Sequence, residues 1–343
     1  MTSRTLSETG SETAGWEHAQ CDLCGGSRGE RFLEIPPYQF KGDPTYRLIR
    51  CPDCSLVFLS PRPRQEIIGR YYAADYYAHG GLSPRKVGLK QKLRNRFLDG
   101  LGGFDQEHVG GRLIQRFVPR GAVDIIISSD KRGTLADVGC GDGARADWYR
   151  QRGFDVYGVE TSERAVRNAQ AIGINARQAT LPEAGFANSF FDVVIMAHVL
   201  EHTHSPTAYL QEAFRILKPG GMLAVAVPNI ESHNAKVFNA SWRLLMSPLH
   251  LYHFSVTTLT RSLSQTGFKV DSIVGKTAYP LMMKRSVTLT RDSRGAWASM
   301  IARLRSGVIV SGLQQLRHGP RKCDSITAYC SKPAGLDARA ARA

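Results

Sequence analysis

The chain has no run of about 18 or more apolar residues, so the sequence predicts no membrane span. Residues 1–20 lack the apolar core of a signal peptide and are predicted to form a disordered tail. We therefore expect a cytoplasmic location. The cysteines number seven in 343 residues, and an odd count without a secretion signal argues against a disulfide framework.

A compact basic block interleaved with aromatic residues is also lacking, although the net charge is +15. Such a charge suits nucleic acid, anionic lipid headgroups or a phosphorylated substrate. Because the basic residues are scattered along the chain, the pattern disfavours nucleic acid as a partner. A nucleic-acid-binding zinc-ribbon protein is kept as an alternative, and it would show steeply salt-dependent binding.

Between residues 134 and 280, short apolar segments alternate with helical patterns. This alternation is typical of a parallel sheet with crossover helices. Ser325–Cys330 has the pattern of a strand that returns to the same sheet. Strands are predicted at Thr134–Val138, Asp155–Val159, Ile174–Ala179, Phe191–Ala197, Met222–Val227 and Lys269–Val274, and helices at Ser162–Ile172, Thr207–Leu217 and Thr257–Gln265.

Four cysteines form two Cys-x-x-Cys pairs, Cys21 with Cys24 and Cys51 with Cys54. Each pair makes a short knuckle whose two thiolates can point at one ion. Two knuckles supply the four sulfurs of a closed, tetrahedral structural zinc site. Since four thiolates leave no open position, we expect the zinc to fold residues 21–60 as a small ribbon and to take no part in chemistry.

A glycine-rich loop, Asp137–Gly143, follows the first predicted strand and reads Asp-Val-Gly-Cys-Gly-Asp-Gly. Glycines let the backbone pass close to a ligand, and the next helix N-terminus can hold a pyrophosphate or a methionine carboxylate. Glu160 ends the second strand, where a carboxylate can accept hydrogen bonds from ribose hydroxyls. These features fit NAD as well as S-adenosylmethionine, so an NAD-dependent oxidoreductase is an alternative.

Further motifs favour S-adenosylmethionine over NAD as the cofactor. The segments Leu135–Gly143, Phe191–His202 and Leu217–Gly221 resemble, in order and spacing, those of the class I S-adenosylmethionine-dependent methyltransferases, the family that includes ubiquinone-type and sugar methyltransferases. The paired cysteines followed by Ser60–Pro63 resemble the zinc-binding N-terminal domain of some bacterial members, several of which act on nucleotide-linked sugars or glycans. The resemblance implies an α/β, Rossmann-like, doubly wound and mostly parallel sheet of seven strands, with methyl transfer to a small-molecule, nucleotide-sugar or glycan acceptor.

The resemblance also implies a cofactor site. The loop residues would line the methionine part of S-adenosylmethionine, Glu160 would bind the ribose, and His198 would border the sulfonium. The acidic residue that the family often has after the third strand is missing here, so the adenine contact falls to backbone groups or Thr180. The implied cofactor-binding set is Asp137, Gly139, Cys140, Gly141, Glu160, Thr180, Leu181 and His198.

Methyl transfer to a hydroxyl or an acidic carbon needs a general base, and histidine titrates near neutral pH. The segment Leu249–Ser255 follows the fifth strand, on the side of the sheet where ligands bind. In the sugar C-methyltransferases that the chain resembles, a histidine near this point is proposed as the base. We predict His253 as the base and His250 as the second choice; the alternative is that one of them caps the next helix or packs under the loop.

An acceptor pocket is predicted between the ribbon, the aromatic run Tyr71–Tyr77 and the loop His250–Phe254. The segment His198–His202 also has the His-x-x-Glu-His spacing of inverted zincins. Because it directly follows an apolar strand and the resembling family carries the same segment, we do not assign a metalloprotease.

The remaining sequence gives a division into domains and one amphipathic segment. Apolar residues at helical spacing predict a helix over residues 295–317, which suits packing on its own domain or contact with a membrane or partner. The predicted parts are tails at 1–20 and 333–343, a ribbon at 21–60, a helical and aromatic linker at 61–133, a core at 134–280 plus 323–332, and a helical insertion at 281–322.

Overall fold

The computed structural model describes residues 15–40, 42–72, 125, 127, 133–276, 280–306 and 317–335. Contacts between Cα atoms divide the chain into two compact units, which are treated separately below. Unit 1 comprises residues 1–73, 198–214 and 225–333, and unit 2 comprises residues 74–197, 215–224 and 334–343.

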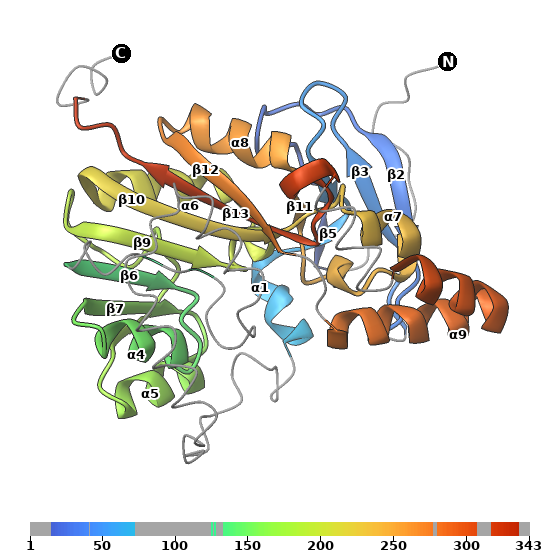
Figure 1. The fold of residues 1–343 in the computed structure, drawn as a ribbon, viewed down its shortest axis with the longest axis horizontal. Helices are drawn as coiled ribbons and strands as arrows, with labels where there is room; N and C mark the ends of the chain where they lie inside the picture. Colours follow the sequence, from blue (N-terminus) through green and yellow to red (C-terminus); the bar gives the residue numbers. More distant parts are fainter. Residues whose placement is uncertain are drawn as a thin grey trace. The chain divides into compact units, whose positions relative to one another are not determined.

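A seven-stranded sheet carries the predicted α/β pattern (Figure 1). Its strands are β6 (Thr134–Val138), β7 (Asp155–Glu160), β8 (Asn175–Gln178), β9 (Phe191–Ala197), β10 (Leu217–Pro228), β12 (Lys269–Lys276) and β13 (Ser325–Ser331). They lie in the order β12–β13–β10–β9–β6–β7–β8. β6 pairs in parallel with β7 and β9, β7 pairs in parallel with β8, and β12 and β13 are antiparallel. The Rossmann-like, mostly parallel sheet of seven strands is therefore confirmed.

The central strands are near-continuous apolar runs because both faces of the sheet are covered. In β9, the side chains of Val193–Met196 are fully buried. β10 begins at Leu217, five residues before the predicted start, so the turn Lys218–Gly221 belongs to the strand. The pattern missed this extension because glycine and proline usually end a strand.

Three helices lie close to the predicted positions: α5 (Glu163–Ala171), α6 (Pro206–Ile216) and α8 (Val256–Gln265). A further helix, α4 (Ala144–Arg150), follows the glycine loop. Side-chain caps fix two of their starts. The Ser162 hydroxyl accepts a hydrogen bond from the Ala165 N–H, and Ser255 forms a capping box with Thr258. Shorter elements are α1 (Gln65–Ile68), η1 (Gly69–Tyr71), η3 (Leu200–His202), α7 (His233–Phe238), η4 (Asn239–Ser241), η5 (Arg243–Leu245) and η6 (Gly319–Lys322).

The cysteine ribbon is built on a four-stranded sheet in unit 1, in the order β11–β4–β3–β2. These strands are β2 (Glu30–Ile35), β3 (Tyr46–Arg50), β4 (Val57–Leu59) and β11 (Tyr252–His253), and β1 (Trp16–Glu17) pairs separately with β5 (Arg62–Pro63). β11 comes from the predicted histidine segment. His253 lies opposite Val57, and the Leu59 N–H donates to the Leu251 carbonyl at 2.8 Å. The predicted base, His253, is therefore part of the ribbon sheet.

The predicted amphipathic helix is α9, which spans Pro280–Ser306. It begins earlier than the expected residue 295, and its helical geometry is interrupted at Gly295, with φ 86° and ψ 173°. Because the break at Gly295 separates two helical segments, the second begins next to the predicted start, and the prediction is confirmed from 296 to 306; residues 307–316 lie outside the described part. No helix among the residues that the structure describes is long and apolar enough to cross a membrane.

Candidate active site

The glycine loop of unit 2 leaves β6 in a backbone conformation that glycine favours. Gly139, Gly141 and Gly143 have φ values of 64°, 54° and 86°. The Gly139 N–H donates to the Val159 carbonyl at 2.8 Å, and the Gly141 N–H donates to Oε2 of Glu160 at 3.1 Å. The loop is therefore hydrogen-bonded to the end of β7, and its three glycines carry no Cβ atoms.

Glu160 is mostly buried and is oriented by backbone donors on both sides. Its Oε1 accepts from the N–H groups of Thr161 at 2.8 Å and Ser162 at 2.9 Å, at the start of α5. Since each carboxylate oxygen can accept more than one hydrogen bond, this fixed group fits the predicted ribose contact.

Asp137 forms a buried ion pair that the sequence did not predict. Its side chain is fully buried, and Oδ1 accepts from Nε of Arg145, on α4, at 2.7 Å. Burial raises the pKa of the Asp137 carboxyl, and the Arg145 charge opposes that rise. Oδ2 has no hydrogen-bond partner within the described residues. An ammonium group is the kind of donor that this oxygen lacks, so Asp137 fits the methionine end of the cofactor.

Other predicted cofactor residues point their side chains into the protein. Leu181 is fully buried and Cys140 nearly so. A Cβ at Gly158 would lie 2.7 Å from Sγ of Cys140, which shows how tightly this thiol packs. The Thr180 hydroxyl donates to Glu183 at 2.6 Å. Cys140 and Leu181 could therefore reach a ligand only through their backbone.

His198 directly follows β9 and belongs to unit 1. Its φ of 57° is unusual for a residue with a side chain and marks local strain of about 1 kcal/mol. Its Nδ1 lies 3.0 Å from Oε1 of Glu201. The His198 side chain is 23% exposed and that of Glu201 only 1%. A partly accessible imidazole is thus paired with a buried carboxylate.

Three more histidines of unit 1 gather beside this pair. The ring centroids of His202 and His250 are 4.5 Å apart, and those of His250 and His253 are 6.3 Å apart. Nδ1 of His250 lies 2.9 Å from the Leu244 carbonyl, and Nδ1 of His202 lies 3.1 Å from the Tyr72 hydroxyl. Tyr72 from the aromatic run thus contacts the cluster, while Tyr76 and Tyr77 lie outside the described residues, and the acceptor pocket stays a prediction.

The two predicted bases are both buried, with 3% of each residue exposed. Burial lowers the pKa of His253 to about 3. Burial, with the neighbouring His202, places the pKa of His250 well below the usual range. Nε2 of His253 has no hydrogen-bond partner in the described part of the chain. Both imidazoles are therefore neutral at physiological pH.

Glu201, His202 and His250 each offer one ligand atom, and these atoms lie within 4.8 Å of one another. This donor set could hold a divalent ion. The His-x-x-Glu-His segment, from which no metal site was predicted, does not contain His250. A spacing along one segment could not reveal that partner, because it comes from a distant loop.

The four ribbon cysteines converge as predicted. The Sγ atoms of Cys21 and Cys54 are 3.3 Å apart, those of Cys24 and Cys51 are 3.5 Å apart, and all four lie within 4.8 Å of one another. Zinc–sulfur bonds of about 2.3 Å in a tetrahedron place sulfurs about 3.8 Å apart, so the cluster is compatible with zinc.

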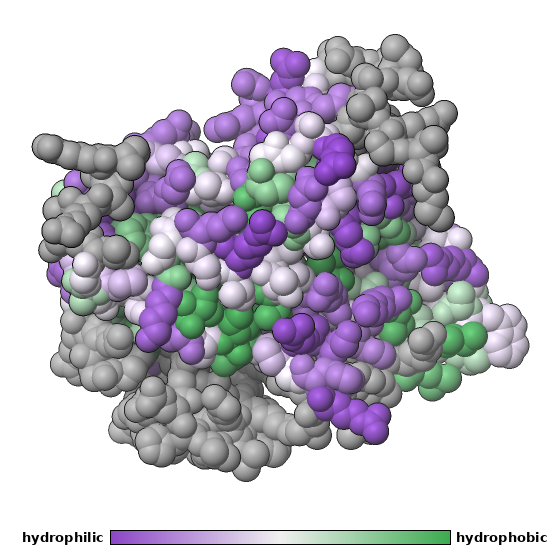
Figure 2. All heavy atoms as spheres, turned by 90° about the horizontal axis from the view of Figure 1, so that it is seen from above, coloured by the Kyte–Doolittle hydropathy of each residue, from purple (hydrophilic) through white to green (hydrophobic). Residues whose placement is uncertain are grey.

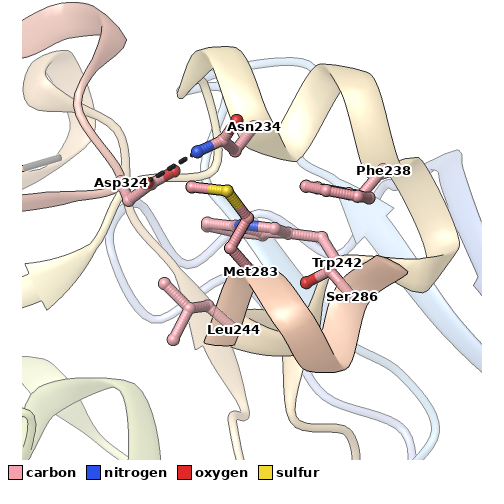
Figure 3. A pocket seen from close by; sticks show the side chains of 7 residues that line it. All are labelled: Asn234, Phe238, Trp242, Leu244, Met283, Ser286 and Asp324. Atoms are coloured by element: carbon pink, nitrogen blue, oxygen red, sulfur yellow. Dashed lines mark hydrogen bonds between the residues drawn. The ribbon is translucent and has the colours of Figure 1, made fainter. Parts of the chain in front are cut away.

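One small pocket in unit 1 is lined by residues of α7, η5 and α9 and by their neighbours (Figure 3). Its volume of about 10 Å³ is room for about one water molecule, so it is too small for an acceptor. Asn234 donates to Asp324 at 2.9 Å along one side. The lining residues are Asn234, Phe238, Trp242, Leu244, Met283, Ser286 and Asp324.

Several known proteins are similar to this chain. A family model described as a methyltransferase domain matches residues 106–273. A ubiquinone biosynthesis O-methyltransferase from Parvibaculum lavamentivorans is 25% identical over 49% of this chain and 71% of its own length. A probable S-adenosylmethionine-dependent methyltransferase from Mycolicibacterium smegmatis is 28% identical over 41% of this chain and 54% of its own length.

Among solved structures, an S-adenosylmethionine-dependent methyltransferase from Archaeoglobus fulgidus is 18% identical, with a TM-score of 0.43, over 69% of this chain and 99% of its own. The domain match, the named relatives and the seven-stranded sheet together identify the chain as a class I S-adenosylmethionine-dependent methyltransferase.

Proposed function

We propose that the enzyme methylates a hydroxyl group of a small-molecule acceptor and that His198 takes the proton. The observation that carries this proposal is the contact between His198 and the buried carboxylate of Glu201. The name of the Parvibaculum relative, an O-methyltransferase of ubiquinone biosynthesis, supports oxygen as the methylated atom. The sugar and glycan acceptors predicted from the ribbon carry hydroxyl groups too, and they belong to the same proposed class.

S-adenosylmethionine, when bound, supplies an electrophilic methyl group for in-line attack by the acceptor oxygen. The loop at Gly139–Gly143, Glu160 and Asp137 are the residues proposed to hold it. As an ionised carboxylate can only accept hydrogen bonds, Glu201 selects the His198 tautomer that carries its proton on Nδ1. Nε2 is then the proton acceptor, and Glu201 stabilises the imidazolium that forms.

His198 is placed ahead of His253, the base expected from sequence. A histidine with a pKa of about 3 is a weak base at neutral pH, and His253 is buried. His198 also follows a strand that runs in register with β6: Met196 lies opposite Val138, the residue before Gly139.

Transfer of a labelled methyl group from S-adenosylmethionine to a panel of hydroxylated small molecules tests the proposal. We expect His198→Ala to lower turnover by about 10²- to 10⁴-fold, with binding of S-adenosylhomocysteine retained. Glu201→Gln should lower turnover less and change its pH profile. His18→Ala, at an exposed histidine, is the matched control.

Unchanged turnover in His198→Ala would refute the assignment, and a loss confined to His253→Ala would restore His253 as the base. Exclusive methylation of nitrogen or carbon acceptors would overturn the proposed acceptor class.

We also propose that the cysteine cluster holds one structural zinc ion. Metal analysis of the purified protein should give about one zinc per chain, and Cys24→Ser should reduce that content. Zinc-free protein that unfolds at the same temperature as the untreated protein would contradict a structural role.

A further inference from the structure

Large hydrophobic side chains that are exposed in the described part of the chain all belong to one helix. They are Trp297, Met300, Ile301 and Leu304 of α9, with exposed fractions of 76%, 46%, 50% and 69%. Scattered single exposures are normal, but a contiguous group marks an interaction site. We call these four residues the α9 stripe.

Helix geometry places the four side chains of the α9 stripe on one face, because their spacing is i, i+3, i+4 and i+7. The other face is already packed: Ser299 and Ala302 are buried. The Ser299 hydroxyl donates to the Val287 carbonyl at 3.2 Å, which ties the second half of α9 to the first. The stripe therefore faces away from the contacts that hold the helix.

The helix is strongly basic. Arg291 and Arg294, in the turn before the stripe, are exposed, as are Lys284 and Arg285. Figure 2 shows hydrophobic and hydrophilic side chains next to each other at the right-hand end of the molecule, the end at which Figure 1 draws α9. The α9 sequence contains one acidic residue, Asp292, and six basic ones: Lys284, Arg285, Arg291, Arg294, Arg303 and Arg305.

We propose that the α9 stripe docks the enzyme on an anionic lipid surface. A helix with tryptophan and aliphatic residues on one face and basic residues elsewhere suits the boundary between headgroups and acyl chains. The basic residues of α9 add attraction to anionic headgroups. A second copy of the chain fits less well, since pairing this face with itself would bring two basic helices together.

Co-sedimentation of the full-length, zinc-loaded protein with lipid vesicles tests the proposal. One set of vesicles is phosphatidylcholine alone, and the other contains about one third phosphatidylglycerol. We expect partitioning onto the anionic vesicles to be at least about tenfold stronger. The double variant Trp297→Ser with Leu304→Ser should lose this binding, and Arg291→Gln with Arg294→Gln should weaken it several-fold.

Arg150→Gln with Arg167→Gln is the charge-matched control, because both arginines are exposed on α4 and α5 of unit 2. It should bind vesicles as the wild type does. Absence of binding to anionic vesicles, or equal binding by the serine variant, would overturn the proposal. A wild-type dimer that the serine variant converts to a monomer in sedimentation would assign the stripe to a second copy instead.

Discussion

The carboxylate of Asp22 accepts a hydrogen bond from the backbone N–H of Thr207 at 2.7 Å, so a residue of the first cysteine knuckle caps helix α6. Its second oxygen accepts from the Ser205 hydroxyl at 2.8 Å. Asp22 lies between Cys21 and Cys24. The cysteine ribbon therefore satisfies a donor at the start of the helix that follows Glu201 and His202.

Removing this cap should destabilise unit 1. We expect Asp22→Ala to lower the free energy of unfolding by about 1–2 kcal/mol, the usual cost of losing an N-terminal cap, with zinc content unchanged. Urea unfolding followed by circular dichroism measures the change. The matched control is Asp53→Ala in the second knuckle, where the carboxylate forms an exposed ion pair with Arg28. Equal stability of the two variants would contradict the capping role.

Arg62 connects the ribbon to the histidine segment through hydrogen bonds. Its side chain is 12% exposed, and it donates to Glu17 at 2.8 Å and to the Tyr252 hydroxyl and the His204 carbonyl at 3.0 Å each. Because lysine lacks the planar fork of arginine, Arg62→Lys should lower the free energy of unfolding by about 2 kcal/mol. Arg64→Lys, at an exposed position nearby, should have little effect. Identical urea midpoints for both variants would contradict a stabilising role for the Arg62 hydrogen bonds.

The buried ion pair of Asp137 and Arg145 in unit 2 should contribute more stability than the exposed pair that Arg150 forms within α4. Asp137→Asn removes the charge that faces Arg145, and breaking a buried ion pair costs about 3 kcal/mol. Asp147→Asn removes the partner of Arg150, whose side chain is 47% exposed, and should cost less than about 1 kcal/mol. Thermal unfolding of both variants checks the difference; a larger loss in Asp147→Asn would refute the ranking.

The free energy of unfolding should fall as the pH is lowered, because a buried histidine takes up a proton only when the chain unfolds. The pKa of His253 is about 3 in the folded protein and about 6.5 in the unfolded chain, so between these values the unfolded state binds the extra proton. The stabilising contribution is complete above pH 6.5 and is lost as the pH falls toward 3. His253→Gln should reduce the slope of unfolding free energy between pH 4 and 5.5 by about 1.4 kcal/mol per pH unit. An unchanged slope, compared with His18→Gln, would contradict the burial of a neutral imidazole.

Much of the sheet could be predicted because its signals are local. β6 and β9 have the predicted bounds, and Ser162 caps the predicted helix, since apolar runs and capping residues are read within a few positions. The converging cysteines were predicted from their spacing. The positive φ of His198 has no such signal in the sequence.

Contacts between distant segments could not be predicted from one sequence. The pairing of β11 with β4 and the cap from Asp22 to Thr207 join residues far apart in the chain. The burial of His250 and His253 depends on such long-range contacts. Their prediction as bases therefore rested on residue type alone. The stripe on α9 was predicted as an amphipathic pattern, but only its exposure shows that its apolar face is not covered by the described residues.

The most direct test of the cofactor assignment is calorimetric titration of the zinc-loaded protein with S-adenosylhomocysteine and, separately, with NADH. We predict saturable binding of one S-adenosylhomocysteine per chain, weakened at least about tenfold by Glu160→Ala because a fixed acceptor for the ribose hydroxyls is lost. NADH should give no saturable heat. Tight binding of NADH without binding of S-adenosylhomocysteine would contradict the account.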